Sequence, residues 1–438
     1  MPNSSLHAAP FASRCGRSPA AAPSPFVRIW LLQGLLTACL IAALLMSSRA
    51  HAEGSFKQFL DGLWPDAKAA GVSREVFDTA FKGMEPDLTL PDLTLPGRDK
   101  ADSSKGQAEF TRPPSEYLDK AYLGRLAADG RAMLKKYEPA LIKIEREVGV
   151  DRYSLLAIWG RETAFGTYKL PHDAIRVLAT EAYVGRRKEM FRLEIVAALK
   201  MLQMGVPRAV MRSSWAGAVG LTQFMPTEFI TYAPNPDGTR LDIWNSVPDA
   251  LTAAGRQLAG KGWVRGETWG YEVRVPQGSD CSLEGPTQER PLSEWAKLGF
   301  VRAGGKPFTP AQMKLNAYLM MPAGGYGPAF LVLENYKVIR RYNTSDLYAV
   351  FVGNLADRIA GGGDFEGAWG GTAGQKTTTI QEIQTRLQAM GADVEKIDGK
   401  IGSNTRKVIG GYQRANQMKV DCWPSDGLLA HLRSVAQK

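Results

Sequence analysis

Cysteine and histidine are scarce in this chain, with four of each among 438 residues. The cysteines form no CxxC pair, and no cluster of cysteine and histidine occurs. Because structural zinc sites need such clusters, none is predicted. Motifs for RNA or DNA recognition are also missing, so no nucleic-acid partner is expected. No cofactor is predicted.

Acidic residues are absent from the first 52 positions, although four arginines occur there. Residues 29–46 are almost entirely apolar, and Ala50-His51-Ala52 then offers a small-residue cleavage site. A basic start, an apolar centre and an A-x-A ending are typical of a secretory signal peptide. We therefore expect residues 1–52 to be removed during export.

Two other interpretations of this segment stay open. Leu36-Thr37-Ala38-Cys39 fits a lipobox, which would leave Cys39 acylated. Against this, residues 40–46 stay apolar, whereas a lipoprotein normally becomes polar after the cysteine. The apolar run is also close to the ~18 residues of a membrane span, so an uncleaved anchor is the third interpretation. All three predict export.

Removal of residues 1–52 lowers the net charge from +10 to +6, because the segment holds four of the 54 basic residues and none of the 44 acidic ones. A modest basic excess suits an anionic partner such as a cell-wall polymer or a lipid surface. Only Cys281 and Cys422 remain after export. In an oxidising compartment they can form a disulfide, although two buried free thiols are an equal alternative.

Apolar periodicity predicts a mainly helical α+β body with a small β component. Helices are expected within residues 123–148, 196–204 and 250–258. Strands are expected at residues 271–275, 329–333 and 336–339. The tandem copies of PDLTL at 86–90 and 91–95 contain two prolines and predict an extended or mobile loop.

The sequence predicts a large body over residues 53–360, a linker over 361–378 and a small domain over 379–438. Glycine dominates the start of the linker, which predicts a segment with little to bury. Beyond it, three apolar stripes at helical spacing predict a domain of three short helices.

The most informative stretch is IWGRETAFG, residues 158–166. Asp151 is a helix-cap candidate before it. Leu155, Ile158 and Glu162 then follow at the helical period, so the carboxyl shares the face that packs inward. Lost hydration would raise the pKa of Glu162 and keep it protonated, as a general acid for glycosidic cleavage requires. A glutamate that caps a turn or pairs with an arginine is the alternative.

With these features, residues 53–360 resemble the B-type family of membrane-bound lytic murein transglycosylases. The blocks that carry the resemblance are EFTRP at 109–113, WGRET at 159–163, SWAGAVG at 214–220, QFMP at 223–226, PLSEW at 291–295 and RYNTS at 341–345. The C-terminal segment resembles the three-helix peptidoglycan-binding module often joined to such enzymes. Its blocks are IQTRL at 383–387, DGKIG at 398–402 and YQRAN at 412–416. The resemblance implies a lysozyme-like catalytic domain in the periplasm.

The resemblance also implies that Glu162 is the sole catalytic acid and base. Its protonated form would protonate the oxygen between MurNAc and GlcNAc, and its carboxylate would then take the proton of the C6 hydroxyl. That hydroxyl closes onto the anomeric carbon and gives a 1,6-anhydro sugar without water. A hydrolase would use two carboxylates, about 5–9.5 Å apart. Asp173, Glu181 and Asp242 lack a comparable apolar, glycine-framed context.

Eight other residues match substrate-binding positions of the family. Ser214 and Gln223 would hydrogen-bond the sugar near the scissile bond. Tyr117 would stack on a sugar ring, and Arg186 and Arg187 would hold carboxylates of the stem peptide. The remaining matches, on the cleft floor, are Asn343, Ser345 and Tyr348. Without the resemblance, the small residues of SWAGAVG indicate close packing, the arginines a solvated face, and Tyr348 a core ring.

The expected partner is the peptidoglycan glycan strand, with cell-wall synthesis proteins as further candidates. Membrane contact is expected only if Cys39 is acylated. Some relatives carry an EF-hand-like loop, but residues 234–242 here have too few acids and too many prolines, so no metal is predicted. Two other functions stay open: a muramidase that hydrolyses the same bond, and a catalytically silent wall-binding scaffold.

Overall fold

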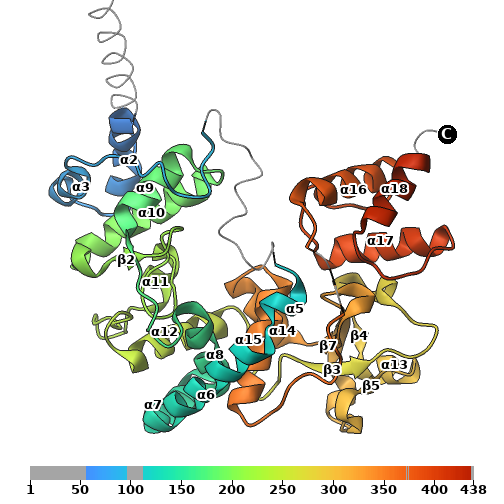
Figure 1. The fold of residues 1–438 in the computed structure, drawn as a ribbon. Helices are drawn as coiled ribbons and strands as arrows, with labels where there is room; N and C mark the ends of the chain where they lie inside the picture. The colour runs from blue at the N-terminus through green and yellow to red at the C-terminus, as the bar shows by residue number, and fades with distance from the viewer. Residues whose placement is uncertain (1–55, 96–111, 371, 373, 436–438) are drawn as a thin grey trace, which may run out of the picture. The chain divides into compact units, whose positions relative to one another are not determined.

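The computed structural model describes residues 56–95, 112–370, 372 and 374–435 (Figure 1). The chain divides into a short N-terminal unit, Met1–Gln58, and a large unit, Phe59–Lys438, to which the helices and strands named below belong. The expected signal segment lies outside the described residues. No helix within the described ranges is long and apolar enough to cross a membrane.

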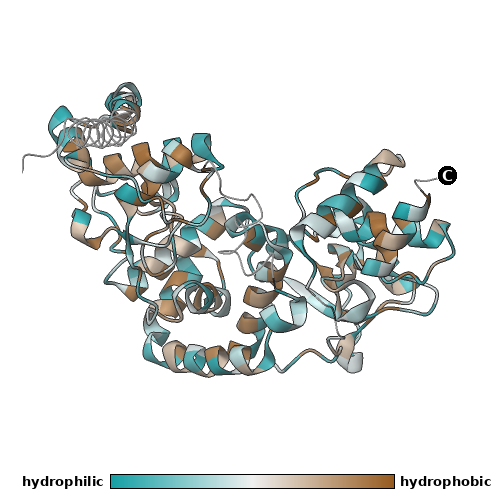
Figure 2. Ribbon diagram, turned by 45° about the horizontal axis from the view of Figure 1, so that its top comes forward, coloured by the Kyte–Doolittle hydropathy of each residue, from teal (hydrophilic) through white to brown (hydrophobic). Residues whose placement is uncertain are grey.

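Helices dominate the body of the large unit, as the apolar periodicity predicts. Most of these helices carry apolar residues on one side, toward the core, and polar residues on the other, toward solvent (Figure 2). The helices are α2 Trp64–Ala69, α3 Arg74–Phe81, α5 Pro114–Tyr117, α6 Lys120–Lys136, α7 Glu138–Val148, α8 Arg152–Thr163, α9 Ala174–Val184, α10 Lys188–Gln203, α11 Pro226–Tyr232, α12 Val247–Gly260, α13 Leu292–Lys297, α14 Glu334–Tyr342 and α15 Asp346–Ile359.

Helix α8 is the central element, packed against α6, α7, α12 and α15. Gly149 ends α7 in the left-handed conformation (φ 88°), and the Asp151 carboxylate then accepts a hydrogen bond from the Ser154 amide and caps α8. Seven consecutive residues, 154–160, are buried. A Cβ at Gly160 would lie 2.6 Å from the Phe165 ring, so only glycine allows the chain to fold back there.

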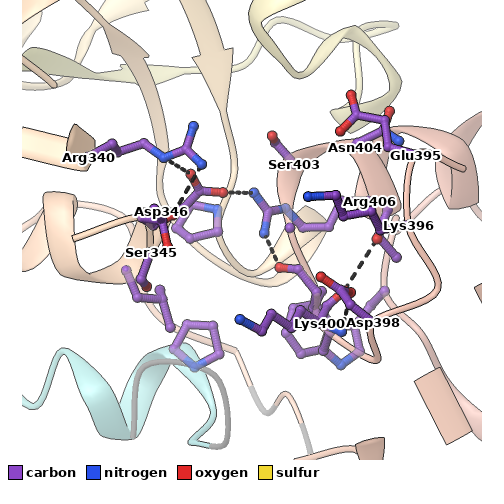
Figure 3. A pocket seen from close by; sticks show the side chains of 18 of the residues that line it. Arg340, Ser345, Asp346, Glu395, Lys396, Asp398, Lys400, Ser403, Asn404 and Arg406 are labelled. Carbon is purple, nitrogen blue, oxygen red and sulfur yellow. Dashed lines mark hydrogen bonds and ion pairs between the residues drawn. The ribbon is translucent and has the colours of Figure 1, made fainter. Parts of the chain in front are cut away.

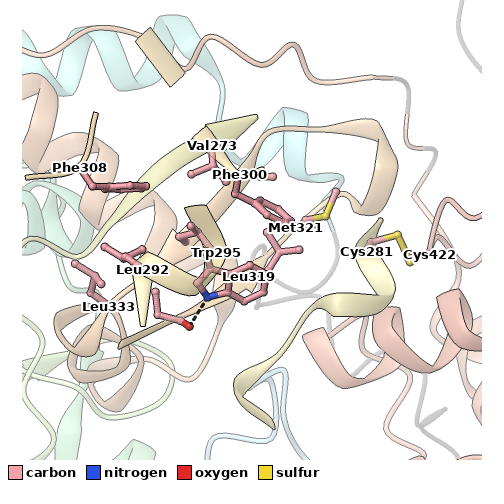
Figure 4. Close-up of a cluster of buried hydrophobic side chains, with 13 residues drawn as sticks. Val273, Cys281, Leu292, Trp295, Phe300, Phe308, Leu319, Met321, Leu333 and Cys422 are labelled. Atoms are coloured by element: carbon pink, nitrogen blue, oxygen red, sulfur yellow. Dashed lines mark hydrogen bonds between the residues drawn. A yellow bond between two sulfur atoms is a disulfide. The ribbon is translucent and has the colours of Figure 1, made fainter. Parts of the chain in front are cut away.

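A five-stranded antiparallel sheet lies beside the helices, in the order β4-β6-β7-β3-β5. The strand bounds, including a separate pair β1 and β2, are β1 His172–Asp173, β2 Arg212–Ser213, β3 Gly270–Arg274, β4 Arg290–Pro291, β5 Val301–Arg302, β6 Asn316–Met320 and β7 Ala329–Val332. The hydrophobic core beside the five-stranded sheet contains Trp295, whose indole donates a hydrogen bond to the Ala317 carbonyl. Cys281 lies at one edge of this core (Figure 4).

Two local predictions of the body are wrong. The strand expected at 336–339 belongs to helix α14, because Tyr336 and Ile339 are buried one helical turn apart while charged residues occupy the other face. The single helix expected within 123–148 is two helices that break at Tyr137, with Pro139 in the first turn of the second.

Helices α16 Thr377–Ala389, α17 Ser403–Ala415 and α18 Asp426–Val435 form the C-terminal module. Its small core contains Ile383, Leu387, Ile409 and Leu432, among others, which confirms the three-helix fold. A disulfide joins Cys281 to Cys422, and α17 packs against the short 3-10 helix Cys281–Leu283. Of the two states that the sequence left open for these cysteines, the structure has the disulfide.

The glycine-rich linker contacts the sheet, although none of residues 361–370 is fully buried. The Phe365 ring packs edge-on against Phe330 of β7, with 4.9 Å between centroids. The amides of Glu366 and Gly367 donate hydrogen bonds of 3.0 and 2.7 Å to the Glu272 carboxylate of β3. The prediction of a segment with little to bury agrees with these residues, whereas their contacts with β3 and β7 were not predicted.

Candidate active site

Glu162 stands in the last turn of α8, as predicted. After it, Ala164 and Phe165 both adopt positive φ angles, 47° and 56°, and reverse the chain. The Thr163 hydroxyl donates a 2.7 Å hydrogen bond to the Leu221 carbonyl and thereby ties the helix end to the SWAGAVG–QFMP segment. Glu162 itself is half-buried. A strained turn and a buried helix thus hold one carboxyl at a partly open position.

The Tyr348 hydroxyl donates a hydrogen bond to Oε1 of Glu162. Only 1% of Tyr348 is exposed. Burial, followed by the nearby negative charge of Glu162, raises the pKa of Tyr348 well above its ordinary value, so the hydroxyl stays a donor. Tyr348 therefore fixes the orientation of the carboxyl that the sequence predicts to be catalytic.

The charge of Glu162 also acts on a second tyrosine, Tyr342. Burial and then that charge raise the pKa of Tyr342 well above its ordinary value. Its hydroxyl donates a hydrogen bond to the Thr222 carbonyl, next to the predicted substrate residue Gln223. Tyr342 thus connects α14 to the QFMP segment beside the carboxyl.

Arg161 supplies the positive charge of the site. Its guanidinium lies 5.1, 5.8 and 5.2 Å from the ring centroids of Tyr117, Tyr348 and Phe351. Burial opposes its charge, but Tyr117 and Glu162 raise its pKa above the ordinary value. The guanidinium therefore stays charged within an aromatic cage beside Glu162.

Ser214 and Gln223 belong to one tight loop. The Ser214 hydroxyl accepts from the Ala218 amide at 3.3 Å, and the Gln223 side chain donates to the Gly220 carbonyl at 3.0 Å, with Gln223 itself at φ 54°. A Cβ at Gly217 would lie 2.3 Å from Leu178. Close packing therefore accounts for at least this glycine, while Ser214 and Gln223 stay half-exposed and able to contact a ligand.

Asn343 and Ser345 organise the start of α15. The side-chain oxygen Oδ1 of Asn343 accepts a hydrogen bond from the Ser345 amide at 3.1 Å. The Ser345 hydroxyl caps the helix by accepting from the Tyr348 amide at 3.3 Å. Ser345 is 2% exposed. In this structure both side chains position Tyr348, and their contact with substrate stays a prediction.

Two protein-family models match this chain. A model of the transglycosylase SLT domain matches residues 55–357, and a model of a peptidoglycan binding domain matches residues 376–430. The chain belongs to the SLT transglycosylase family. The family resemblance of the sequence is thereby confirmed.

Relatives of this SLT transglycosylase include SltB3 from Pseudomonas aeruginosa, solved in complex with NAG-anhNAM-pentapeptide. It is 40% identical over 86% of this chain and 99% of that chain, with a TM-score of 0.77. Membrane-bound lytic murein transglycosylase B from Escherichia coli K12 is 27% identical over 241 residues, which span 53% of this chain and 63% of that protein. The Escherichia coli enzyme Slt35, in complex with bulgecin A, is 23% identical and shares the fold, with a TM-score of 0.55 over 70% of this chain and 92% of that chain.

The Tyr117 ring of this SLT transglycosylase is only 6% exposed. Its hydroxyl accepts two hydrogen bonds from Arg161, at 2.7 and 3.1 Å, and its ring meets Phe351 edge-on. The structure thus gives Tyr117 a role in holding Arg161 beside Glu162. Stacking on a sugar stays a prediction, and it would require the ring to become more exposed.

Arg186 and Arg187 form a second cluster with Asp92, a residue of the PDLTL repeat. Their guanidinium nitrogens lie 2.6 and 3.2 Å from the two Asp92 oxygens, and Asp92 is 1% exposed. The two arginines are 45% and 40% exposed, so one side of each stays open. The PDLTL repeat is therefore anchored by these ion pairs, whereas the sequence predicted an extended or mobile loop. A carboxylate of the stem peptide would have to compete with the Asp92 carboxylate for the two arginines.

Glu181 lies beside this cluster and is fully buried. Burial, and then Asp92, raise the pKa of Glu181 to about 7. Because the folded protein holds this proton more tightly than the unfolded chain, we expect the contribution of Glu181 to stability to fall as pH rises from about 4.5 to about 7. Glu181→Gln lacks this loss, and relative to wild type it should gain up to about 3 kcal/mol of unfolding free energy between pH 4.5 and 8.

Urea unfolding at both pH values measures this difference. Glu189→Gln is the matched control, because Glu189 is exposed on the neighbouring helix α10. A Glu181→Gln variant whose stability changes with pH in parallel with wild type would show that Glu181 ionises normally.

The other acids considered as a second catalytic carboxyl have structural partners. Asp173 caps α9 through the Arg176 amide and pairs with Arg208 at 2.9 Å. Asp242 accepts hydrogen bonds of 3.0 Å from the amides of Trp244 and Asn245, and its pKa is below the ordinary value although burial opposes this. Neither has the contacts of Glu162 among the described residues.

Residue-by-residue reasoning missed Arg161 and Tyr342 as parts of the site. In the sequence, Arg161 and Tyr342 occur only as members of the WGRET and RYNTS blocks. The sequence signal that could have found them is adjacency to a predicted site residue: Arg161 precedes Glu162, and Tyr342 precedes Asn343. Their roles depend on rings and carbonyls more than 40 residues away in sequence, which no local pattern encodes.

Proposed function

We propose that this chain is a lytic transglycosylase that cleaves the MurNAc-β-1,4-GlcNAc bond of peptidoglycan and leaves 1,6-anhydroMurNAc ends. The observation that carries the proposal is a single half-buried carboxyl, Glu162, oriented by Tyr348 and flanked by Arg161. One carboxyl suffices when the attacking hydroxyl belongs to the substrate, whereas hydrolysis with two carboxylates needs a second acid at the same cleft.

In the first step, protonated Glu162 gives its proton to the glycosidic oxygen, and the bond from that oxygen to the MurNAc anomeric carbon breaks. Positive charge develops on the sugar while Glu162 becomes a carboxylate. The Tyr348 hydroxyl donates to this carboxylate, and the Arg161 cation stabilises it electrostatically.

In the second step, the carboxylate of Glu162 takes the proton of the C6 hydroxyl of the same MurNAc. The C6 oxygen forms a bond to the anomeric carbon, which closes the anhydro ring and restores the protonated acid. Ser214, Gln223 and Asn343 are the residues we expect to hold the sugar during ring closure, and Arg186 and Arg187 are the candidates for the stem peptide.

Mass spectrometry of the soluble products from purified sacculi tests the reaction. Products that end in 1,6-anhydroMurNAc are one water lighter than those with reducing ends, and we expect the lighter ones. Reducing MurNAc ends would identify a muramidase instead. Sacculi that bind the protein without releasing products would favour a wall-binding scaffold.

We also propose that the enzyme works in the periplasm, where both its expected substrate and an oxidant for the Cys281–Cys422 pair are present. Acylation at Cys39 would place it on a membrane. Intact mass measurement of the exported protein distinguishes the forms, because cleavage after Ala52 leaves an unmodified chain that begins at Glu53.

Loss of the Tyr348 hydroxyl should change the pH dependence of this reaction. A hydrogen bond to a charged group is worth about 1.5–3 kcal/mol and favours the carboxylate, so Tyr348→Phe should raise the pKa of Glu162 by about one unit. We expect kcat to fall about tenfold and the alkaline limb of the kcat profile to move upward. The pH profile of sacculus digestion measures both.

Tyr326→Phe is the matched control for this prediction, since it removes another tyrosine–carboxylate hydrogen bond, the 2.8 Å one to Asp421. Its profile should match that of wild type. An alkaline limb that moves downward in Tyr348→Phe would contradict the assignment of Tyr348 as a donor to Glu162.

A further inference from the structure

The C-terminal module inserts one buried arginine, Arg406, into a group of carboxylates of the catalytic body. Arg406 is 1% exposed, and its two partners, Glu284 and Asp346, are 0% and 9% exposed. Its Nε lies 3.0 Å from Oε2 of Glu284, and its Nη2 lies 3.2 Å from Oδ2 of Asp346. Figure 3 shows Asp346 between Arg406 on one side and Arg340 on the other.

Asp346 depends on these cations to stay ionised. Burial alone would raise its pKa, but Arg340 and Arg406 hold that pKa below its ordinary value. Tyr336 also donates a 2.9 Å hydrogen bond to it. A buried carboxylate that loses one of its cations must move toward water or take up a proton, because an unpaired buried charge is costly.

The position of Asp346 matters because it is the first residue of α15. Tyr348 follows two residues later in the same turn, and its hydroxyl contacts Glu162. The side chain of Asp346 and the capping hydroxyl of Ser345 therefore both hold the first turn of α15, which sets the position of the Tyr348 side chain. A shift of this turn changes the hydrogen bond to Glu162 directly.

We propose that Arg406 is a positioning residue for the reaction: by holding Asp346, the C-terminal module fixes the first turn of α15 and keeps Tyr348 against Glu162. The proposal rests on the proposed catalytic role of Glu162. It makes the module part of the catalytic apparatus, in addition to any role in wall binding.

Other contacts hold the module in place without touching α15. The Cys281–Cys422 disulfide is one, the hydrogen bond from Tyr326 to Asp421 is another, and Arg414 pairs with Asp280. The fork of Arg406 can therefore be altered while the module stays attached. Arg414 lies on the same helix as Arg406, α17, and pairs with the same part of the body, so Arg414→Ala is a matched control.

Arg406→Lys is the test variant, because an ammonium keeps the charge but cannot hold two carboxylates in the fork geometry of a guanidinium. We expect kcat on sacculi to fall by up to about tenfold, no more than in Tyr348→Phe, with KM little changed. The alkaline limb should move in the same direction as in Tyr348→Phe. Arg414→Ala should keep the kcat and pH profile of wild type.

A double-mutant cycle separates positioning from general weakening. If Arg406 acts through Tyr348, adding Arg406→Lys to Tyr348→Phe should lower kcat no further. Fully additive losses, or an equal loss of kcat in Arg414→Ala, would overturn the proposal. So would an unchanged kcat and pH profile in Arg406→Lys.

Hydrogen exchange provides a measurement that does not need activity. Exchange at the amides of residues 346–349 should accelerate in Arg406→Lys but not in Arg414→Ala. If wild type releases no anhydro products but this exchange pattern holds, the proposed reaction fails while the positioning of α15 stands. If Arg406→Lys does not fold, Asp346→Asn replaces it, with the same expectations, because Tyr336 can still donate to the asparagine carbonyl. Unchanged exchange in the folded variant would overturn the proposal.

Discussion

Glu162→Gln should lose at least about 10³-fold in kcat on purified sacculi, while binding of the protein to sacculi stays at the wild-type level. The amide fills the same space and can still accept the hydrogen bond from Tyr348, but it can neither give a proton to the glycosidic oxygen nor take one from the C6 hydroxyl. Because one group performs both proton transfers, no other side chain can replace the lost step. Release of anhydro-sugar products over time, together with a pull-down on sacculi, measures the two quantities.

Asp173→Asn is the control for this experiment, because Asp173 was a candidate for a second acid and pairs with Arg208 instead. We expect it to keep wild-type kcat within a few fold. A large loss of turnover in Asp173→Asn, or substantial turnover in a folded Glu162→Gln, would contradict the one-carboxyl reaction. Equal melting temperatures of both variants exclude a trivial effect on folding.

Removal of the disulfide should have the largest effect on stability. Cys281 and Cys422 are 141 positions apart, so their bond closes a long loop. In the chain-entropy model such a loop is worth about 4–5 kcal/mol. We expect Cys281→Ala/Cys422→Ala to unfold at a clearly lower denaturant concentration than wild type, as measured by guanidinium unfolding.

The same experiment with a reducing agent provides the control. Wild type should become as unstable as the double variant, and the double variant should not respond to the reductant. Identical unfolding midpoints for wild type with and without reductant would show that the two cysteines are not joined in the folded protein.

Local features of the sequence sufficed to predict helix α8, which carries the proposed catalytic carboxyl of Glu162. Asp151 caps α8, Gly149 ends the helix before it, and Gly160 leaves room for the Phe165 ring. Each of these signals acts within a few residues of Glu162. The fold class and the three helices of the module were predictable for the same reason, since helical periodicity is local.

Contacts between distant segments were not predictable from local patterns. Tyr348 lies 186 residues from Glu162, and only the family resemblance selected it. Arg406 appears in the sequence as an ordinary polar residue of a short helix, although its fork is buried between two carboxylates. A long charged side chain has the same local pattern whether it faces water or a buried partner, so its role depends on the tertiary structure.

The contact between the linker and the sheet has one signal in the sequence. Phe365 stands within the glycine-rich stretch, and its ring packs on Phe330 of β7. Aromatic side chains bury large apolar areas, so even one within a glycine-rich segment is enough to fix it. The wrong strand at 336–339 has a different cause, because four apolar-rich residues are too short to distinguish a period of 2 from one of 3.6.

The disulfide also constrains how the molecule is made. When a chain crosses a membrane from its N-terminus, Cys281 emerges well before Cys422. The Cys281 thiol therefore stays unpaired while about a third of the chain follows it. If residues 1–52 are removed, Cys15 and Cys39 leave with them, and the waiting thiol has one intramolecular partner. Oxidative folding then requires no choice among pairings and no isomerase to correct one, and the covalent bond is completed only when the C-terminal module has arrived.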